Sequence, residues 1–330
     1  MHIELAAATP VSTSLPDRHV VNGATMGTRY GVVFYSDLPV EQAALRADLQ
    51  AAVDRVDLQM SPWQRDSILC RFNREPPGTW VDLPDETYEV VHAALRICVE
   101  SDGAFDPFVG ELVAAWGFGP DRQTVDTAMA ARLKETWQHQ RREVELDRNG
   151  RRLRRLSEGQ LDLCGIAKGY GADCLSRVMS RWGLCDHLVS IDGELRASGC
   201  KPGGAPWSVA LERPERDVRS EAFTLALASA GVATSGNYRK VRNASGTMVS
   251  HTMHPQHGVP VDNGLLSVSV LSGSCMEADA WATALMVMGP DQGLAKARDC
   301  GLDAIFLNRK PSGGIAMSAS RPELLPESMR

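Results

Sequence analysis

A helix bracketed at both ends, between Ser274 and Pro290, constrains what this chain can fold into more than any other stretch. Ser274 and Glu277 have the spacing of a capping box, and the pair Gly289-Pro290 is typical of a helix end. On a helical wheel one face of this segment is apolar, and it is formed by Trp281, Leu285 and Met288. The stretch therefore predicts a helix with one apolar face and one polar face.

The polar face of this helix carries Asp279 and Thr283. They are four residues apart, so a carboxylate and a hydroxyl project side by side. Both are hard oxygen ligands of the kind that Mg²⁺ takes when it also holds phosphates. The alternative is a surface aspartate favoured by the helix dipole, beside a threonine bonded to its own backbone.

Bulk composition indicates a soluble globular protein without a general affinity for nucleic acid. The 330 residues are 43% hydrophobic and 23% charged, with a net charge of −6. The sequence has no run of about eighteen apolar residues, so no transmembrane segment is expected. The N-terminus lacks the basic start and apolar core of a signal peptide, and we expect a cytoplasmic protein.

Eight cysteines are spread along the chain without any Cys-x-x-Cys pair. In a chain of this length the spacing predicts reduced, mostly buried thiols rather than a disulfide frame or a zinc site.

The order of elements predicts an α+β fold with mixed or antiparallel sheets and packed helices. Residues 1–18 contain two prolines and no periodicity and are expected to be a flexible leader, so that residues 19–330 form one two-lobed unit. Helical spacing covers residues 39–59, 84–100 and 109–116. Short strands joined by turns are expected at residues 18–35, 144–146, 153–156, 187–191, 194–198, 207–211, 223–227, 231–234, 266–271 and, as the last strand, 302–307.

Residues 160–170 predict a second unit, in which an alternating strand meets a glycine turn and opens a helix. Such a junction directs backbone N–H groups and a partial positive charge toward an anion. Lys168 lies in the first turn of that helix, where the dipole disfavours a cation unless an anion is bound. The alternative is a lysine whose ammonium group extends to the solvent.

Three further residues each allow two interpretations. Met26 sits between two glycines and is either an apolar side chain offered outward or part of an ordinary hairpin. Trp63, in a Ser-Pro-Trp loop, is either a stacking plate or a core anchor. Asp106, which precedes a proline, either caps a helix or contacts the ring or hydroxyls of a ligand.

The segment 251–258 holds three histidines in seven positions. It lacks the helical His-x-x-x-His context of a zinc protease. One histidine that acts as a general base beside a phosphate site is therefore the better interpretation.

Taken in order, these segments resemble the ApbE family of FAD:protein FMN transferases, over about residues 20 to 310. The most specific blocks are Phe105-Asp106-Pro107 with Trp116-Gly117-Phe118-Gly119, and Gly165-Ile166-Ala167-Lys168-Gly169. The remaining matching pieces are Met26-Gly27-Thr28, residues 67–73, residues 234–238, residues 251–258 and residues 278–283.

The resemblance implies a T-fold-like unit and an Mg²⁺-dependent enzyme. It splits FAD, attaches the FMN half to a threonine or serine of a target flavoprotein, and releases AMP. The metal ligands carried over are Asp279, Thr283 and a backbone carbonyl at Gly165, and His251 matches the base. The residues expected to bind FAD are Met26, Trp63, Ala104, Phe105, Asp106, Asp162, Lys168 and Thr252.

Two segments depart from the family pattern. Where the family has His-Ile-(Ile/Leu)-Asp-Pro-x-Thr-Gly, this chain places His254 and His257 at the Asp and Thr positions, and Asp192-Gly193-Glu194 stands for Gly-Gly-Asp. Two alternatives to transfer therefore stay open, namely hydrolysis of FAD to FMN and AMP and a non-catalytic FAD-binding protein.

Overall fold

The computed structural model describes residues 15–120, 124–137, 143–215, 220–244, 246–310 and 312–327. Most of the expected leader, residues 1–14, lies outside this part. Strand β1 (Asp17–Thr25) includes the last two residues of the expected leader.

An antiparallel sheet of eight strands runs through the molecule, in the order β1-β2-β6-β7-β10-β15-β16-β17. The α+β class and the antiparallel pairing agree with the sequence-based expectation. The other strands of this sheet are β2 (Thr28–Ser36), β6 (His187–Ile191), β7 (Glu194–Ser198), β10 (Gly231–Gly236), β15 (Leu265–Ser272), β16 (Asp303–Arg309) and β17 (Ile315–Ala319).

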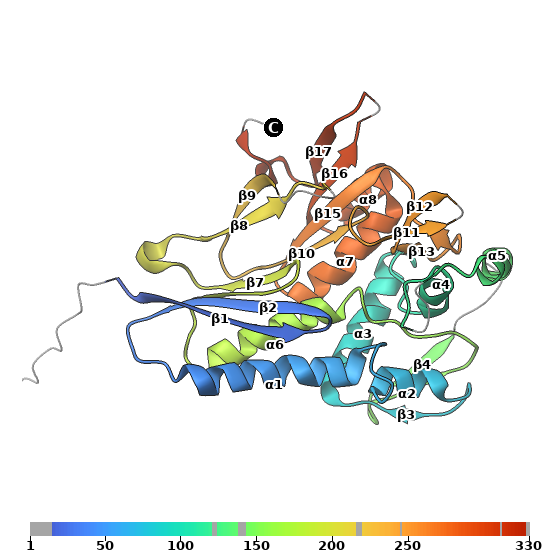
Figure 1. Ribbon diagram of the computed structural model, residues 1–330, viewed down its shortest axis with the longest axis horizontal. Coiled ribbons are helices and arrows are strands. Elements are labelled where there is room, and N and C mark those ends of the chain that lie inside the picture. Colours follow the sequence, from blue (N-terminus) through green and yellow to red (C-terminus); the bar gives the residue numbers. More distant parts are fainter. Residues whose placement is uncertain are drawn as a thin grey trace, which may run out of the picture.

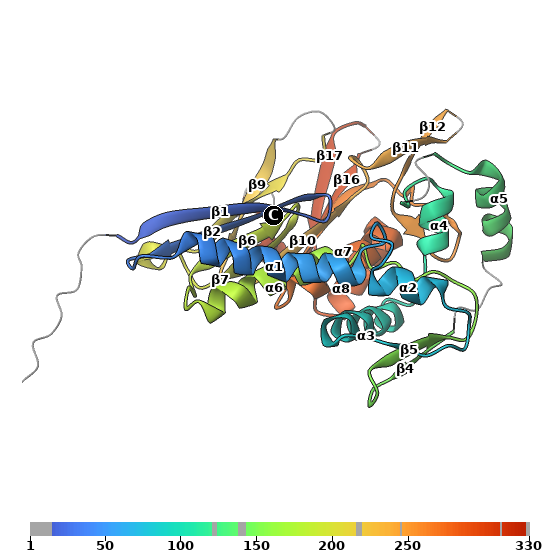
Figure 2. The ribbon, with the colours of Figure 1, turned by 60° about the horizontal axis from the view of Figure 1, so that its bottom comes forward.

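Helices cover one face of the sheet (Figure 1; Figure 2). Because successive side chains of a strand point to opposite faces, Ala233 and Phe306 pack beneath the helices, whereas their neighbours Val232 and Ile305 face the other way. The covering helices are α1 (Gln42–Met60), α6 (Ala167–Arg181), α7 (Cys275–Met288) and α8 (Pro290–Asp299), and α3 (Asp85–Glu100) packs against α1 and α7.

A two-stranded hairpin covers the opposite face of the sheet. Its strands are β8 (Trp207–Glu212) and β9 (Glu221–Leu227), whose alternate side chains are buried in a second hydrophobic core. The sheet is therefore buried on both faces where these layers meet.

A smaller group of elements surrounds one end of the helical layer, with its own apolar cluster around Leu133, Trp137 and Met253. Its elements are α2 (Ile68–Arg74), β3 (Val81–Asp82), α4 (Gly110–Ala115), α5 (Thr127–Thr136), β4 (Val144–Asp147), β5 (Arg152–Arg155), β11 (Val241–Ala244), β12 (Thr247–Ser250), β13 (Met253–His254) and β14 (Val259–Pro260). No helix in the described ranges has both the length and the apolar character needed to cross a membrane.

The expected strand before the glycine turn does not form. Both the N–H and the carbonyl of Leu161 bond to the side chain of Asn73, and the N–H of Asp162 donates to the carbonyl of Pro107. Only Gln160 makes a bridge, to Val109. The backbone groups that a ladder needs are thus already occupied.

The C-terminal part of the chain also differs from the prediction. The Gly289-Pro290 pair ends α7, but Pro290 immediately begins α8, because proline fits the first turn of a helix. The strand expected to be last is followed by β17.

The cysteines are all free, but the expectation of mostly buried thiols is wrong. Only Cys174 and Cys275 are buried, while Cys164, Cys185 and Cys300 are exposed. The exposed ones lie in turns and at a helix end rather than on core faces.

Candidate active site

Helices α6 and α7 approach each other closely at Gly169. A Cβ atom placed there would lie only 2.3 Å from the carbonyl oxygen of Cys275, so the crossing requires a residue without a side chain. The N–H of Gly169 donates to Oδ2 of Asp279 at 3.0 Å. Asp279 is 4% exposed, so the interpretation as a surface aspartate is wrong.

Thr283 lies one turn after Asp279 and faces the same corner. Its hydroxyl is 3.1 Å from that of Ser235 at the end of β10, rather than bonded to its own helix. A Cβ on Gly165 would come within 3.2 Å of the Thr283 hydroxyl oxygen. The structure thus brings together Asp279, Thr283 and Gly165, the three expected metal ligands.

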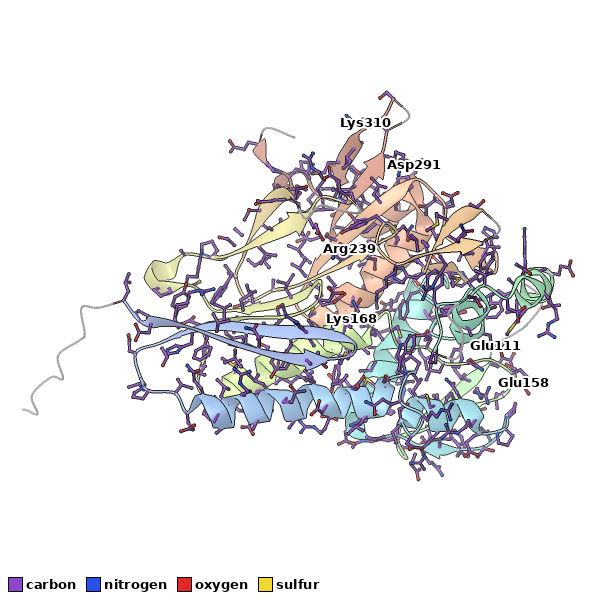
Figure 3. All side chains as sticks on the ribbon, in the orientation of Figure 1. Glu111, Glu158, Lys168, Arg239, Asp291 and Lys310 are labelled. Atoms are coloured by element: carbon purple, nitrogen blue, oxygen red, sulfur yellow. The ribbon has the colours of Figure 1, made fainter. Side chains whose placement is uncertain are left out.

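Lys168 lies near the centre of the molecule (Figure 3), with its ammonium nitrogen 2.5 Å from Oε1 of Glu194. Burial by itself would lower the pKa of Lys168, but Glu194 and then Asp279 raise it above its usual range, so the ammonium stays charged. The lysine is held by a buried partner, so the interpretation as a solvent-extended lysine is wrong.

Glu194 and Asp279 are two buried carboxyl groups beside this single ammonium. Burial raises the pKa of Glu194, and Lys168 opposes the increase. Burial likewise raises the pKa of Asp279, and Lys168 and the N–H of Gly169 oppose it. Each carboxyl is therefore costly to ionise here, and a bound cation would favour the ionised form.

The residues present fit a magnesium ion held partly by substrate. Among the described residues, Oε2 of Glu194 is buried and has no hydrogen-bond partner, and the same holds for Oδ1 of Asn237 just beyond β10. Three or more His, Cys, Asp or Glu side chains placed to hold a metal are not found in the described ranges. A carboxylate, a hydroxyl and a carbonyl match the oxygen ligands that Mg²⁺ prefers when phosphates complete its shell.

The Phe-Asp-Pro segment packs against this corner. A Cβ on Gly165 would be 3.3 Å from Cε2 of buried Phe105. The carboxylate of Asp106 accepts the N–H of Phe108 at 2.8 Å, so it fixes a turn, whereas α4 begins later without a side-chain cap. Asp162 fixes the adjoining turn, because its carboxylate accepts the N–H of Cys164.

The other residues expected to bind FAD occupy contrasting environments. Met26 forms the turn of the β1–β2 hairpin with φ of 47°, and a Cβ on Gly171 would lie 3.1 Å from its Cε, so it turns in against α6 rather than outward. Trp63 is 55% exposed, so the interpretation as a core anchor is wrong. Ala104 and Thr252 are buried.

His251 follows β12, and its backbone N–H donates to the carbonyl of Lys240 at 3.1 Å. Its Nδ1 is buried and has no hydrogen-bond partner within the described residues. Burial, together with Lys240 and Lys168, lowers the pKa of His251 to about 4. The imidazole is therefore neutral near pH 7 and can accept a proton.

The altered segment after His251 keeps a defined backbone. The N–H of Gly258 donates to the carbonyl of His254, and the indole N–H of Trp137 donates to the carbonyl of Pro255. The rings of His254 and His257 lie 4.0 Å apart. The two replacements therefore change the side chains on this turn, while the turn itself stays anchored to α5.

Two residues of the corner were not singled out from the sequence as site residues. The sequence presents Glu194 only as part of a departure from the family pattern, and Ser235 only within the matching residues 234–238. The signal that points to Glu194 is that it keeps an acidic residue at the Asp position of the Gly-Gly-Asp pattern.

Similarity to known proteins agrees with this arrangement. A model of the ApbE family matches residues 26–306. FAD:protein FMN transferase from Klebsiella pneumoniae (strain 342) is 34% identical over 313 residues, which cover 93% of this chain and 87% of that protein.

Solved structures of flavin transferases have the same fold. The apo form of Pseudomonas stutzeri flavinyl transferase ApbE superposes with a TM-score of 0.82 at 33% identity, covering 95% of this chain and 98% of the other. The flavin transferase ApbE from Vibrio cholerae gives a TM-score of 0.82 at 30% identity, covering 94% and 100%. Since the similarity extends over nearly the whole chain, this protein belongs to the ApbE family and is a transferase.

Proposed function

We propose that this protein transfers the FMN moiety of FAD to the hydroxyl of a threonine or serine in a target flavoprotein, with Mg²⁺ and with release of AMP. The observation that carries the proposal is the meeting of Asp279, Thr283 and Gly165 beside the ammonium of Lys168, which is paired with Glu194. Oxygen ligands and a fixed positive charge in one corner suit a diphosphate. The names of the relatives, FAD:protein FMN transferase, support the choice of substrate.

Asp279, Thr283 and the carbonyl of Gly165 would hold the metal. When bound, Mg²⁺ supplies charge neutralisation and orientation of the phosphate oxygens. Lys168 adds a charge that does not depend on pH in the physiological range, because its pKa is raised. Phosphoryl transfer needs mainly positioning and charge neutralisation from the protein, and these residues offer both.

His251 would take the proton of the acceptor hydroxyl. The acceptor oxygen forms a bond to the FMN phosphorus, the bond from that phosphorus to the bridging oxygen breaks, and AMP leaves with the electron pair. The neutral state of His251 at pH 7 suits a general base, since a protonated imidazole cannot accept the proton.

Hydrolysis is the second candidate, in which water replaces the acceptor hydroxyl. It is favoured by one observation, namely that His254 and His257 occupy the turn that follows the base. Bulky rings there alter the surface that an acceptor would meet.

One assay distinguishes these activities. The protein is incubated with FAD, MgCl₂ and a candidate acceptor flavoprotein, and AMP release and in-gel flavin fluorescence are measured together. We expect AMP release with covalent fluorescence. AMP without fluorescence would establish hydrolysis, and intact FAD retained on the protein would establish a binding protein.

Asp279→Ala tests the metal assignment. Loss of the buried carboxylate should lower AMP release at least about a hundredfold, because a ligand rather than an outer partner is removed. Asp299→Ala at the end of α8 is the matched control and should keep normal activity. Wild-type AMP release by Asp279→Ala would refute the metal site.

A further inference from the structure

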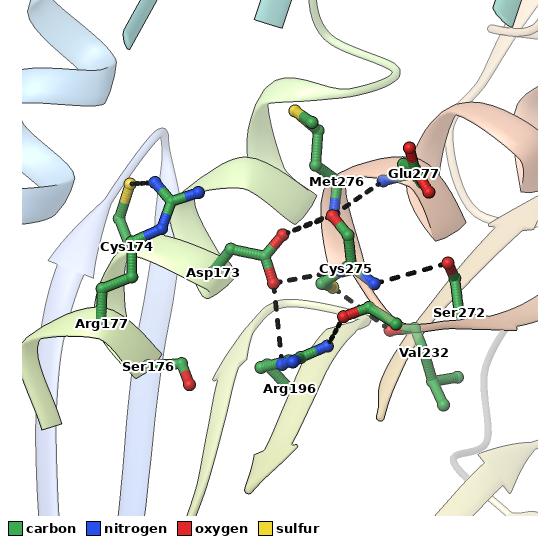
Figure 4. A network of polar contacts seen from close by, with 12 residues as sticks. Asp173, Cys174, Ser176, Arg177, Arg196, Val232, Ser272, Cys275, Met276 and Glu277 are labelled. Carbon is green, nitrogen blue, oxygen red and sulfur yellow. Dashed lines mark hydrogen bonds and ion pairs between the residues drawn. The ribbon is translucent and has the colours of Figure 1, made fainter. Parts of the chain in front are cut away.

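Asp173, on α6, makes contacts that the proposed chemistry does not use. Its carboxylate is buried and accepts the backbone N–H groups of Cys275 at 3.1 Å and Met276 at 3.0 Å (Figure 4). It also accepts the hydroxyl of Ser274 at 2.8 Å. These donors form the N-terminus of α7, so a carboxylate of one helix caps the next helix.

The capping is reciprocal. While Asp173 of α6 accepts N–H groups from the first turn of α7, Asp279 of α7 accepts the N–H of Gly169 in the first turn of α6. The two helices therefore run in opposite directions at this contact. Gly169 of α6 lies beside Asp279 of α7, and Asp173, one turn further along α6, lies beside Cys275, one turn earlier in α7. Two carboxylates thus fix both the spacing and the register of the pair.

Neighbouring residues reinforce this arrangement. Arg196 of β7 approaches Asp173 at 3.9 Å and donates to the carbonyl of Gly273 just before α7. A Cβ on Gly231 would lie 2.6 Å from the N atom of Cys275, so the start of α7 is also pressed against β10. The N-terminus of α7 is therefore held from both α6 and β10 and has little freedom to move.

We propose that Asp173 is a positioning residue for the metal ligand Asp279. By capping α7 from α6, it sets where Asp279 and Thr283 stand relative to Gly165. This inference rests on the proposed function, because it concerns the same metal corner. It extends that function from the ligands to the group that holds their helix in register.

The test compares Asp173→Asn with the wild-type protein. The asparagine amide replaces one acceptor oxygen with a donor group that faces the N–H groups of α7. The start of α7 should therefore shift from its wild-type position relative to α6. Loss of a group that bonds directly to a metal ligand typically costs about ten- to a hundredfold in metal affinity, and Asp173 acts on Asp279 one step further away, through the start of α7. We expect the Kd for MgCl₂, measured by calorimetry with ADP present, to rise about tenfold.

A kinetic readout separates positioning from general damage. In Asp173→Asn the Mg²⁺ concentration for half-maximal AMP release should rise about tenfold, while the rate at saturating Mg²⁺ should stay within about twofold. A variant that is only partly folded would show the opposite, a lower rate with unchanged half-saturation, and that result would overturn the proposal.

Ser274→Ala is a milder second variant, useful where Asp173→Asn folds poorly. It removes the hydroxyl that donates to Asp173, and it should raise the half-saturating Mg²⁺ concentration about two- to threefold, which corresponds to about 0.5 kcal/mol.

Asp147→Asn is the matched control. Asp147 also accepts two backbone N–H groups, from Asn149 and Gly150, and pairs with Arg152, but in the β4–β5 hairpin. It should change stability without changing the Mg²⁺ requirement. If wild-type protein binds no Mg²⁺, the proposed metal site fails together with this inference. If the wild-type protein binds Mg²⁺, and Asp173→Asn and Ser274→Ala bind it with the same affinity as the wild type, only the role of Asp173 is refuted.

Discussion

His251 combines three properties at one side chain: an unpartnered buried Nδ1, a lowered pKa and two nearby lysines. The lysines disfavour a positive imidazole, so the ring remains a proton acceptor at neutral pH. The positive charges of the two lysines would also favour release of the proton from the imidazole after it has been taken from the acceptor hydroxyl. In the proposed mechanism, an imidazole in this environment would release the proton readily after each transfer.

His251→Ala should lower covalent flavin transfer about a hundredfold, which is the usual contribution of general base catalysis. In-gel flavin fluorescence of the acceptor measures it. His92→Ala, on α3 and away from the corner, serves as the control. Transfer by His251→Ala at the wild-type rate would show that another group takes the proton.

The pH dependence of transfer follows from the pKa of about 4 for His251. A lowered pKa means that the active neutral form is present above this value and is lost as pH falls through it. The transfer rate should therefore not decline, on account of this group, between pH 8 and 6, and should fall toward pH 4. Circular dichroism at each pH separates protonation of the base from acid unfolding, and a decline centred near pH 6.5 in folded protein would contradict the assignment.

At the residue scale, helical spacing was enough to place Asp279 beside Thr283, because a four-residue interval fixes neighbours on any helix. It could not show that Asp279 is buried or that Glu194 pairs with Lys168. Both depend on how distant elements meet. Trp63 illustrates the same point, since composition alone could not decide between an exposed and a buried indole.

The α6–α7 crossing is the element on which the corner depends, and Gly169→Ala tests it. The added methyl would meet the carbonyl oxygen of Cys275, a backbone atom that cannot rotate away. We expect a loss of about 1–3 kcal/mol in the free energy of unfolding, measured with urea, and a weaker Mg²⁺ response.

Gly273→Ala is the control for that substitution, because a Cβ there meets nothing within 4 Å. It should change the free energy of unfolding by no more than about 0.5 kcal/mol. If Gly169→Ala and Gly273→Ala had the same free energy of unfolding, the two helices could move apart to admit the added methyl without loss of stability, and the predicted clash would be refuted.

Local sequence signals predicted the elements well where residues that are close in the sequence supply the hydrogen bonds. Ser274 accepts the N–H of Glu277 as the capping box implies, although the carboxylate of Glu277 pairs with Arg96 instead of completing the box. The bounds of β6 and β7 also match the expectation. The helix α8 was missed because a proline after a glycine is compatible with a helix end and with a helix start.

At the scale of the whole molecule, the hairpin β8–β9 contributes to a hydrophobic core separate from that of the helical layer. The substitution Trp207→Ala tests how much this second core contributes to the free energy of unfolding. Trp207 is buried, and its indole N–H donates to the carbonyl of Ser198 at 3.1 Å. We expect a loss of about 3–5 kcal/mol in the free energy of unfolding by urea denaturation.

The Mg²⁺ concentration for half-maximal AMP release should remain unchanged in the folded fraction of Trp207→Ala, because the second core lies on the face of the sheet away from α6 and α7. A shifted Mg²⁺ requirement would show that the two faces of the sheet are coupled.

The fold class followed from the mixture of helical and alternating patterns, but the strand order did not. β2 pairs with β6, and β7 pairs with β10, although several other elements separate them in the sequence. Hydrophobic alternation shows which face of a strand is buried, but it does not show which strand lies beside it.

The pairing of β2 with β6 has a consequence for synthesis of the chain. Phe34 pairs with His187 and Tyr30 with Ile191, so the β2 edge of the β1–β2 hairpin stays open until residues 187–191 have been translated. Unpaired strand edges of this kind are prone to aggregation, and distant contacts slow folding. A nascent chain stalled before residue 187 should therefore depend on chaperones far more than one released after it.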